Sequence, residues 1–392
     1  MLSAIILARA LDTSAFAAYS YFQLTVSMLA AYASMGLGVT ASKYFAQVGH
    51  ESAENNTPPL GTLWCLSILF AILASATVMV TPDSWLSAGL EVPRWFLALG
   101  VLTVAFGIVP GGAILGLERY KQSTLISGFS GSLMLLGAWL AAKSGSPDIA
   151  MGAIIVAALV QAGGNSVIVV RAVGWKKILG GFGLSFTEVC YVFSFAGPML
   201  FVSLMSASGA WLIGRIILHG YEGEQAFALY AIGLQWFSLG LLLPGMLSRV
   251  ILPRLVRISG TEAAAESTKQ LVKQGVWMAI VAAVSVAIVG FLLGPWLTVM
   301  YGDSYQSNSW IIIAFLVIAV LLAPANVVGN AIVANEGQMS WFCLTAMWLL
   351  VLVVTGLVFG QLGAWTGAVA HAASAIVLVL LSFLLARKRE LI

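Results

Sequence analysis

Long apolar runs separated by short polar breaks fill this chain from end to end. A membrane-spanning helix needs about 20 mostly apolar residues, and eleven of the runs are long enough. A twelfth apolar piece, MLSAIILA at the start of the chain, is too short to cross. The predicted spans are 16–40, 60–81, 95–117, 123–142, 148–170, 188–214, 226–247, 275–300, 309–333, 341–360 and 362–386. The pattern therefore predicts an all-α polytopic membrane protein.

Composition strengthens this prediction and excludes several classes of function. Hydrophobic residues make up 60% of the chain and charged residues 8%, whereas an ordinary soluble domain carries about 25% charge. The longest segments between spans, KYFAQVGHESAENNTPP and PRLVRISGTEAAAESTKQLVKQG, leave no room for a soluble domain. We therefore expect a protein that is not an enzyme, and the net charge of +3 gives no reason to expect a nucleic-acid partner.

The three cysteines, Cys65, Cys190 and Cys343, are far apart and lie within or beside apolar runs. A disulfide framework or a metal cluster needs closer or loop-borne cysteines. We interpret all three as small apolar packing residues, and we expect no metal, no cofactor and no catalytic residues.

The distribution of Lys and Arg predicts the orientation of the chain. Fourteen of the 18 basic residues fall on the side that holds the C-terminal ARKRELI. Because cytoplasmic loops carry the excess of Lys and Arg, the C-terminus is predicted to be cytoplasmic. Counting back through twelve segments places the N-terminus on the same side. The other side would hold Arg9, Arg94, Lys143 and Arg215.

Short matches recur in the same order at offsets of 211 to 218 residues and indicate an internal duplication. The pairs are AFAAY (15–19) with AFALY (226–230), AILGLE (113–118) with AIVANE (331–336), and MGA (151–153) with TGA (366–368). Six helices per half is an even number, so both halves would start on one side as parallel repeats. We predict an N-terminal lobe at 1–174, an interfacial connector at 175–187 and a C-terminal lobe at 188–392.

The duplication also predicts a truncated first helix. Arg9 is the expected counterpart of Arg215, but only eight residues precede it, whereas helix 7 begins near Glu188. We expect Met1 to be an internal start, or else the first helix to be short. The segment 261–275 has acidic residues early and lysines late, so we expect a second interfacial helix there.

Several stretches together resemble one known family. LARALDTSAFAAYSYF, followed by SMGLGVTASKYFA, resembles the first loop and second helix of oligosaccharide flippases, the Wzx-like O-antigen and capsule flippases of the multidrug/oligosaccharidyl-lipid/polysaccharide (MOP) superfamily. FAGPMLFVSL (195–204) resembles the start of their helix 7, and YGDSYQ (301–306) their loop before helix 10. ANEGQMS (334–340) resembles their turn after helix 10, although the usual basic residue is missing here.

This resemblance, which covers nearly the whole chain, implies a MATE-like fold of about twelve helices in two six-helix lobes. It implies transfer of a polyprenyl-pyrophosphate-linked oligosaccharide, a repeat unit of O-antigen, capsule or exopolysaccharide, from the inner to the outer leaflet by alternating access. It also implies a bacterial inner-membrane location. The implied partners are membrane lipids and the glycan polymerase and glycosyltransferases of the same pathway.

A pyrophosphate crossing about 30 Å of hydrocarbon calls for cationic side chains, and Arg can bind phosphate through two hydrogen bonds at once. Arg215 lies late in an apolar run, where charge is costly and commonly functional; snorkelling to the interface is the alternative explanation. Arg9 is its repeat partner. The further candidates are Lys43, Arg249 and Arg254 for the pyrophosphate, and Gln23, Gln235, Asn326 and Asn330 for sugar hydroxyls.

His371 lies in the middle of the last span, in GAVAHAASA. A protonatable imidazole there could couple ion flow to transport. The alternative is a neutral histidine that hydrogen-bonds a neighbouring helix, its small neighbours allowing close packing.

Two other functions remain open. A MATE-like exporter of drugs or organic cations would place carboxylates inside its cavity, and this chain has few within its spans. A membrane glycan polymerase or ligase would usually carry a sizeable outer loop with catalytic residues, and the outer loops here are short.

Overall fold

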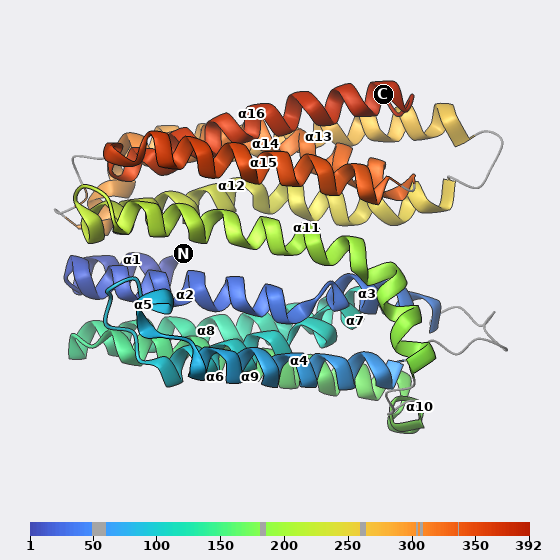
Figure 1. Cartoon of the computed structure of the whole chain (residues 1–392), viewed down its shortest axis with the longest axis horizontal. Helices are drawn as coiled ribbons and strands as arrows, with labels where there is room; N and C mark the ends of the chain where they lie inside the picture. The colour runs from blue at the N-terminus through green and yellow to red at the C-terminus, as the bar shows by residue number, and fades with distance from the viewer. Residues whose placement is uncertain (49–59, 181–185, 259–263, 303–304, 306–308, 336) are drawn as a thin grey trace. The chain divides into compact units, whose positions relative to one another are not determined.

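The computed structural model describes residues 1–392 apart from 49–59, 181–185, 259–263, 303–304, 306–308 and 336. Every regular element in this part of the chain is helical (Figure 1). The helices are α1 (Leu2–Ala10), α2 (Thr13–Ser34), α3 (Leu37–Val48), α4 (Leu60–Val80), α5 (Asp83–Leu86), α6 (Arg94–Phe106), α7 (Ile108–Gly116), α8 (Tyr120–Ser144), α9 (Pro147–Val173), α10 (Trp175–Gly180), α11 (Phe186–Leu218), α12 (Gly223–Ile258), α13 (Ala264–Tyr301), α14 (Ser309–Ala334), α15 (Gln338–Val358), the 3-10 turn η2 (Gly360–Leu362) and α16 (Ala364–Lys388).

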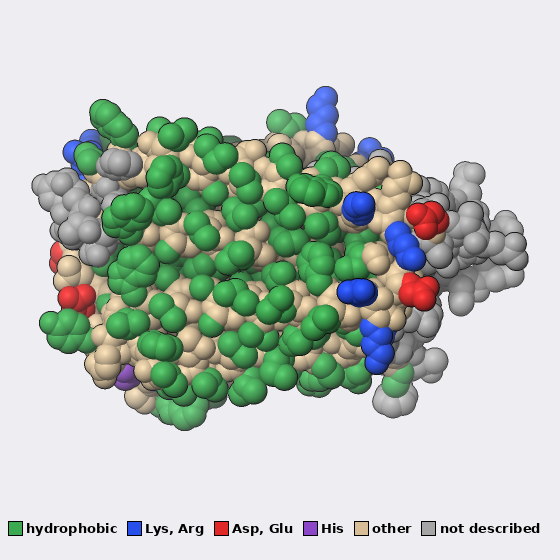
Figure 2. All heavy atoms as spheres, turned by 90° about the horizontal axis from the view of Figure 1, so that it is seen from above, with side chains coloured by type: hydrophobic (Ala, Val, Ile, Leu, Met, Phe, Trp, Pro, Cys, Tyr) green, Lys and Arg blue, Asp and Glu red, His purple; other side chains and the backbone are tan. Residues whose placement is uncertain are grey.

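The predicted spans correspond to helices in the structure. Ten helices, among the described residues, are long and apolar enough to cross a membrane, and the bent pair α2–α3 makes an eleventh. The chain is therefore a multi-pass membrane protein. One face of the molecule is covered in its middle by hydrophobic side chains, with Lys and Arg near its ends (Figure 2), as expected where a helix surface meets lipid and its ends meet water.

The chain divides into two compact units that are built alike. The N-terminal unit is Leu2–Trp211, and the C-terminal unit is Leu212–Ile392 together with Met1. In the N-terminal unit α6 packs against α2, α4 and α9, while α8 packs against α9. In the C-terminal unit α14 packs against α12, α13 and α16, while α15 packs against α16. The order of partners is the same in both units, as a duplication predicts.

The AFxxY repeat occupies equivalent places near the start of α2 and α12. Phe16 and Tyr19 are buried in the N-terminal unit, and Phe227 and Tyr230 are buried in the C-terminal unit. The ring centroids of each pair lie 6.5 Å and 6.2 Å apart, respectively. The repeated letters therefore mark an aromatic pair that anchors each helix in its own core.

The second repeat, AILGLE and AIVANE, ends α7 and α14 with the same backbone hydrogen bond. The Arg119 N–H donates to the Ile114 carbonyl over 3.2 Å, and the Gly337 N–H donates to the Ile332 carbonyl over 2.9 Å. Each bond runs back five residues and satisfies a carbonyl that the helix leaves without a partner. The two segments, which lie 218 residues apart, thus share a local backbone geometry as well as a similar sequence.

The predicted span 16–40 is bent. Asp12 caps α2 by accepting a hydrogen bond of 2.7 Å from the Ala15 N–H, and α2 ends where Met35 and Gly36 adopt positive φ. The axis then turns by 55° into α3. This bend was not predicted from the sequence. Met35 is an ordinary helix former that here takes a left-handed conformation, and the local signal is Gly36, a residue that adopts positive φ readily.

The segment beyond the bend packs closely on α7 through glycines. A Cβ on Gly112 would overlap the backbone of Gly38, and a Cβ on Gly116 would overlap the carbonyl of Ser42. Small residues allow helices to approach at this distance, where van der Waals contact drives association in lipid. The close approach of α3 and α7 therefore depends on glycine, which has no side chain, at these positions of α7.

The two segments that were expected to form interfacial helices, 175–187 and 261–275, differ in how they compare with the structure. α10 lies within the predicted connector 175–187 and buries Ile178, while 181–185 falls outside the described residues. The prediction of a separate helix at 261–275 is wrong from Ala264 onward, because α13 begins there and runs without interruption to Tyr301. Val272 is buried against the ends of α14 and α16, so packing continues the helix where the charge pattern suggested a separate one.

Substituting Gly112 by alanine should lower the free energy of unfolding by about 1–3 kcal/mol, the usual cost of overpacking, since the added methyl group meets rigid backbone. Thermal unfolding of the purified protein in detergent would measure this. Gly111→Ala is the matched control, because a Cβ there meets nothing within 4 Å. Equal melting of the two variants would contradict the close approach of α3 and α7.

Candidate functional site

A row of aromatic and hydroxyl side chains connects α2 to α11 within the N-terminal unit. The Trp211 indole N–H donates to Thr25 Oγ1 over 3.1 Å, and the Tyr32 hydroxyl hydrogen-bonds the Ser208 hydroxyl. The Tyr21 ring lies 6.5 Å from the Trp211 ring, centroid to centroid. These uncharged groups offer hydrogen bonds and ring faces within two membrane-spanning helices.

Sequence analysis missed this row, although a signal was present. Tyr21, Thr25 and Tyr32 follow one another at helical spacing and therefore share one face of α2. Ser208 and Trp211 are three residues apart and share a face of α11. A search for polar faces on otherwise apolar helices, in place of a search for charges, would have found them.

His371 is enclosed by aromatic rings in the C-terminal unit. It is 4% exposed, and its Nε2 hydrogen-bonds the Tyr230 hydroxyl over 3.1 Å. The centroids of Tyr230, Phe237 and Phe315 lie 6.1, 5.7 and 5.8 Å from the imidazole centroid. Three helices, α12, α14 and α16, therefore enclose one imidazole.

Two glycines make room for this aromatic enclosure. A Cβ on Gly233 would overlap the Phe315 ring, and a Cβ on Gly367 would overlap the Tyr230 ring. The arrangement matches the hydrogen-bonded histidine of the sequence hypothesis. Whether His371 also couples transport to an ion stays a prediction.

Arg9 lies in the last turn of α1, a helix of 9 residues, and Arg215 lies in the last turn of the much longer α11. Arg9 is exposed and Arg215 is half-buried. A position so near the helix end lets a long side chain reach the interface. Lys43 is exposed on α3, and Arg249 and Arg254 belong to the last turns of α12, where their side chains lie outside the described part of the structure.

The polar amide candidates are distributed over both units. Gln23 is exposed on α2, whereas Gln235 on α12 and Asn326 and Asn330 on α14 are half-buried. The Gln235 Oε1 is buried and accepts no hydrogen bond from the residues that the structure describes. It is therefore a buried acceptor available to a hydroxyl or a water molecule.

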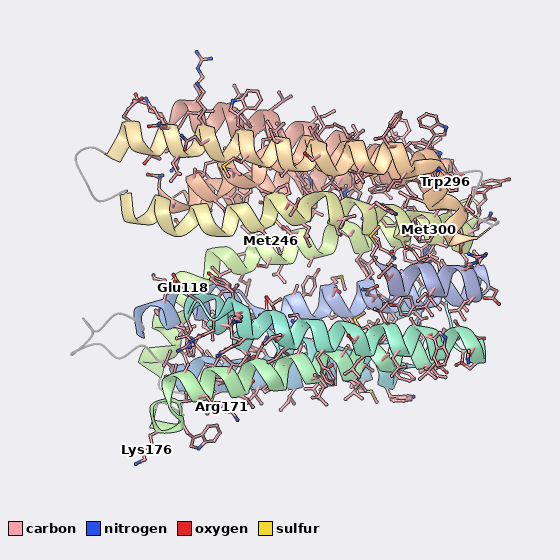
Figure 3. The ribbon with its side chains drawn as sticks, turned by 180° about the vertical axis from the view of Figure 1, so that it is seen from behind. Glu118, Arg171, Lys176, Met246, Trp296 and Met300 are labelled. Carbon is pink, nitrogen blue, oxygen red and sulfur yellow. The ribbon has the colours of Figure 1, made fainter. Side chains whose placement is uncertain are left out.

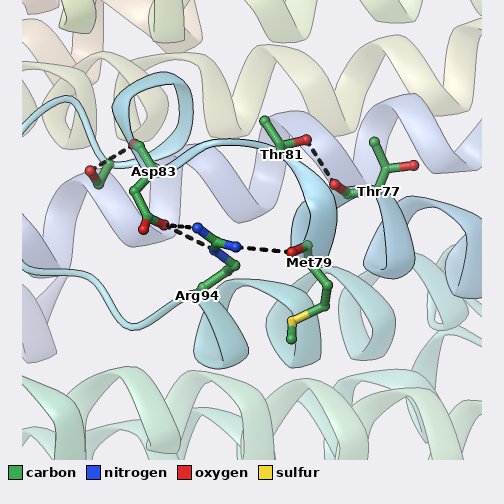
Figure 4. Close-up of polar contacts among 6 residues, drawn as sticks. Thr77, Met79, Thr81, Asp83 and Arg94 are labelled. Carbon is green, nitrogen blue, oxygen red and sulfur yellow. Dashed lines mark hydrogen bonds and ion pairs between the residues drawn. The ribbon is translucent and has the colours of Figure 1, made fainter.

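Carboxylates are placed at the ends of the spanning helices. The Asp and Glu residues within the described parts of these helices all belong to a first turn. They are Asp148, Glu224 and Glu266, together with Glu188, whose side chain lies outside the described part of the structure. Asp83 lies between α4 and α6, where its carboxylate pairs with Arg94 over 2.7 Å, and Arg94 Nη1 also donates to the Met79 carbonyl over 3.0 Å (Figure 4). This ion pair closes the turn between two helices at the end of a span.

Charged side chains also gather at one end of the N-terminal unit. Figure 3 shows Glu118, Arg171 and Lys176 there, and all three are exposed. Such a position fits the boundary between membrane and water. Met246, also labelled, is exposed on α12 and belongs to the apolar surface.

Metal binding has no support in the described residues. No group of three or more His, Cys, Asp or Glu side chains that could hold a metal ion occurs there. Cys65, Cys190 and Cys343 are free thiols.

Comparison with known proteins identifies the fold. No protein-family model matches the chain, and no curated protein matches it. A solved multidrug resistance MATE family transporter of the MOP superfamily, in an inward-facing conformation, is similar with a TM-score of 0.75 at 16% identity, covering 99% of this chain and 93% of that one. An outward-facing structure of such a transporter has a TM-score of 0.73 at 16% identity, covering 99% and 90%.

A third similar structure is a MOP superfamily transporter from Pyrococcus furiosus, with a TM-score of 0.75 at 15% identity, covering 99% of this chain and 90% of that one. Its description states that reverse polarity of its binding pocket suggests a different function. The chain thus has the MATE-like fold of the MOP superfamily, which confirms the predicted fold class.

Tyr230→Phe should destabilise the protein by about 0.6–1.7 kcal/mol, because it removes an interhelical hydrogen bond of the kind measured in membrane proteins and leaves the imidazole of His371 without the hydroxyl. Thermal unfolding in detergent would measure the effect. Tyr221→Phe, at a side chain that is 67% exposed, should melt like the wild type. If both variants melt alike, the hydrogen bond contributes nothing.

Proposed function

We propose that this chain is a membrane transporter that moves a polyprenyl-pyrophosphate-linked oligosaccharide from the inner to the outer leaflet of a bacterial inner membrane by alternating access. The MATE-like fold supports the transporter class, because the similar solved structures are transporters. The substrate class rests on the chemistry of this chain's own spans.

The observation that carries the substrate class is the polarity of the spanning helices. Within the described spanning helices Asp and Glu occur only in first turns, and the polar row on α2 and α11 is uncharged. An organic cation crossing the hydrocarbon needs a carboxylate partner, since an isolated charge there is very costly. Hydroxyls and aromatic rings instead suit sugars, whose hydroxyls need hydrogen bonds and whose ring faces are apolar.

Basic residues at the helix ends complete this proposal. Arg9 and Arg215 stand in the last turns of α1 and α11, and Lys43, Arg249 and Arg254 belong to the opposite ends of the next helices in each half. A pyrophosphate headgroup would meet these cations on entering or leaving, while its polyprenyl chain stays in the bilayer. In this proposal the C-terminus is cytoplasmic, and the glycan polymerase and glycosyltransferases act before and after transport.

A second candidate function is export of drugs or organic cations. It is favoured by the solved structures, two of which are described as multidrug resistance MATE transporters. The two candidate functions predict substrates of opposite charge. Transport assays with an anionic lipid-linked glycan and with an organic cation therefore distinguish them.

The leaflet location of the lipid-linked glycan, measured in a strain that lacks this protein, tests the proposal directly. We expect the glycan to accumulate on the cytoplasmic face, and the wild-type chain to restore its appearance on the outer face. Arg215→Ala should reduce that restoration about tenfold or more at equal protein level, the scale of a lost charge-assisted hydrogen bond, and Arg215→Lys should retain part of it.

Arg94→Ala is the control, since Arg94 is held in an ion pair with Asp83 at a helix end. Glycan that reaches the outer face without this protein would refute the flippase proposal. Efflux of organic cations by reconstituted protein, with no movement of the lipid-linked glycan, would establish the second candidate instead.

A further inference from the structure

Four helix ends meet at one end of the C-terminal unit and share a buried apolar cluster. These are the start of α13, the end of α14, the start of α15 and the end of α16. The buried members of the cluster are Val272, Val328, Ala331, Ile332, Ala386 and Leu391. Trp341 and Leu344 of α15 pack against it. Residues that flank these positions in sequence are therefore held near one another.

Five cations flank the cluster. Lys269 and Lys273 lie three residues before and one residue after Val272, on the first turns of α13; Arg387, Lys388 and Arg389 follow Ala386 directly. We call these five residues the basic rim. Lys269 is partly exposed and the other four are exposed. The described carboxylates on the same segments are Glu266 and Glu390, both exposed, so positive charge is in excess.

The C-terminal part of the rim is held in place. Glu390 adopts a positive φ of 57°, its N–H donates to the Arg387 carbonyl over 3.1 Å, and the Leu391 N–H donates to the Ala386 carbonyl over 2.9 Å. This is the Schellman arrangement, with its apolar contact provided by Leu391, which is 6% exposed. Glu390 and Leu391 therefore form a C-terminal cap on α16, which fixes the backbone of this segment.

Arg389 is fixed further by the turn between α14 and α15. Its Nη1 donates to the Asn335 carbonyl over 3.2 Å, and its Nη2 donates to Ser340 Oγ over 2.9 Å. A cation at this place also complements the negative end of the α14 dipole. The basic residue that is missing from the sequence of this turn is thus supplied by the end of the chain.

The basic rim lies where phospholipid headgroups are expected. Two of the candidate spans, Thr268–Gly294 and Ala364–Lys388, begin or end within it, so its charges stand at the boundary between hydrocarbon and water. Clustered Lys and Arg at this depth attract anionic lipids, and the attraction acts within about a Debye length of the surface.

We propose that the basic rim is a binding surface for the headgroups of anionic phospholipids in the leaflet that it faces. The buried cluster and the helix cap fix the backbone positions from which these cations extend, and Arg389 is fixed by its own hydrogen bonds, so part of the entropy cost of bringing the charges together is already met in the fold. The partner is a bilayer lipid such as phosphatidylglycerol. This interaction is separate from the transported substrate and does not depend on the proposed function.

The test measures lipid binding to the purified full chain in a non-ionic detergent by native mass spectrometry, with phosphatidylglycerol and phosphatidylcholine as the two probes. The rim variant carries Lys269→Gln, Lys273→Gln, Arg387→Gln and Lys388→Gln and keeps Arg389, whose hydrogen bonds are structural. We expect the wild type to prefer phosphatidylglycerol, and the rim variant to bind it about tenfold more weakly or worse, as the loss of several surface charges implies.

The matched control removes four exposed cations from the N-terminal unit, as Arg119→Gln, Lys121→Gln, Arg171→Gln and Lys176→Gln, and should weaken phosphatidylglycerol binding much less than the rim variant does. If the rim variant binds like the wild type, or if both variants lose affinity equally, the proposal is wrong. Competition by inorganic pyrophosphate at matched ionic strength would assign the rim to a free phosphate group and would equally overturn it. If the rim variant does not fold, Lys273→Gln with Lys388→Gln is measured against Lys121→Gln with Lys176→Gln.

Discussion

The need to satisfy every backbone N–H and C=O inside hydrocarbon governs this structure. It explains why the described chain is helical throughout its spans, and why the helices break only where other bonds take over. At the end of α2 the Met35 N–H donates to the Tyr32 carbonyl, and at the start of α3 the Thr40 N–H donates to the Gly36 carbonyl. At Gly107, between α6 and α7, the N–H is shared between the carbonyls of Thr103 and Val104.

Once the backbone is satisfied, side-chain size decides which helices can pack closely. Apolar burial gives little drive between helices in lipid, so close contact matters more than area. Glycine makes such contact possible at two places, because it has no Cβ. Gly112 leaves space for the backbone of Gly38, and Gly367 leaves space for the ring of Tyr230. In the second case the space admits an aromatic ring, and that ring carries the hydroxyl that His371 binds.

Features with a strong local signal could be predicted from the sequence. The spans follow from length and hydropathy, and the two halves follow from short matches such as AFAAY and AFALY, whose aromatic rings are equivalently buried. The bend at Met35 was not predicted, because its one local signal is Gly36, and glycine also occurs within apolar runs that do not bend. The aromatic enclosure of His371 brings together residues up to 141 positions apart, and Arg389 reaches a turn 54 residues earlier. Such pairings leave no mark in a local pattern. The charges that sequence singled out as candidate site residues lie mostly at helix ends, whereas the polar row on α2 and α11 carries no charge and was overlooked.

The interruptions in α2–α3 and α6–α7 have no counterpart in the other half, where α12 and α14 run continuously. The two interruptions lie side by side, since a Cβ on Gly38 would stand 2.9 Å from the Ile108 side chain. The two halves are thus interrupted in different ways. In the N-terminal pair the backbone leaves the helical conformation at Met35 and Gly36, whereas in the C-terminal pair Pro244 and Pro324 each remove one backbone donor from a helix that continues past them. A hinge in the first half would therefore be confined to one turn, whereas the helices of the second half would bend only by local distortion at their prolines.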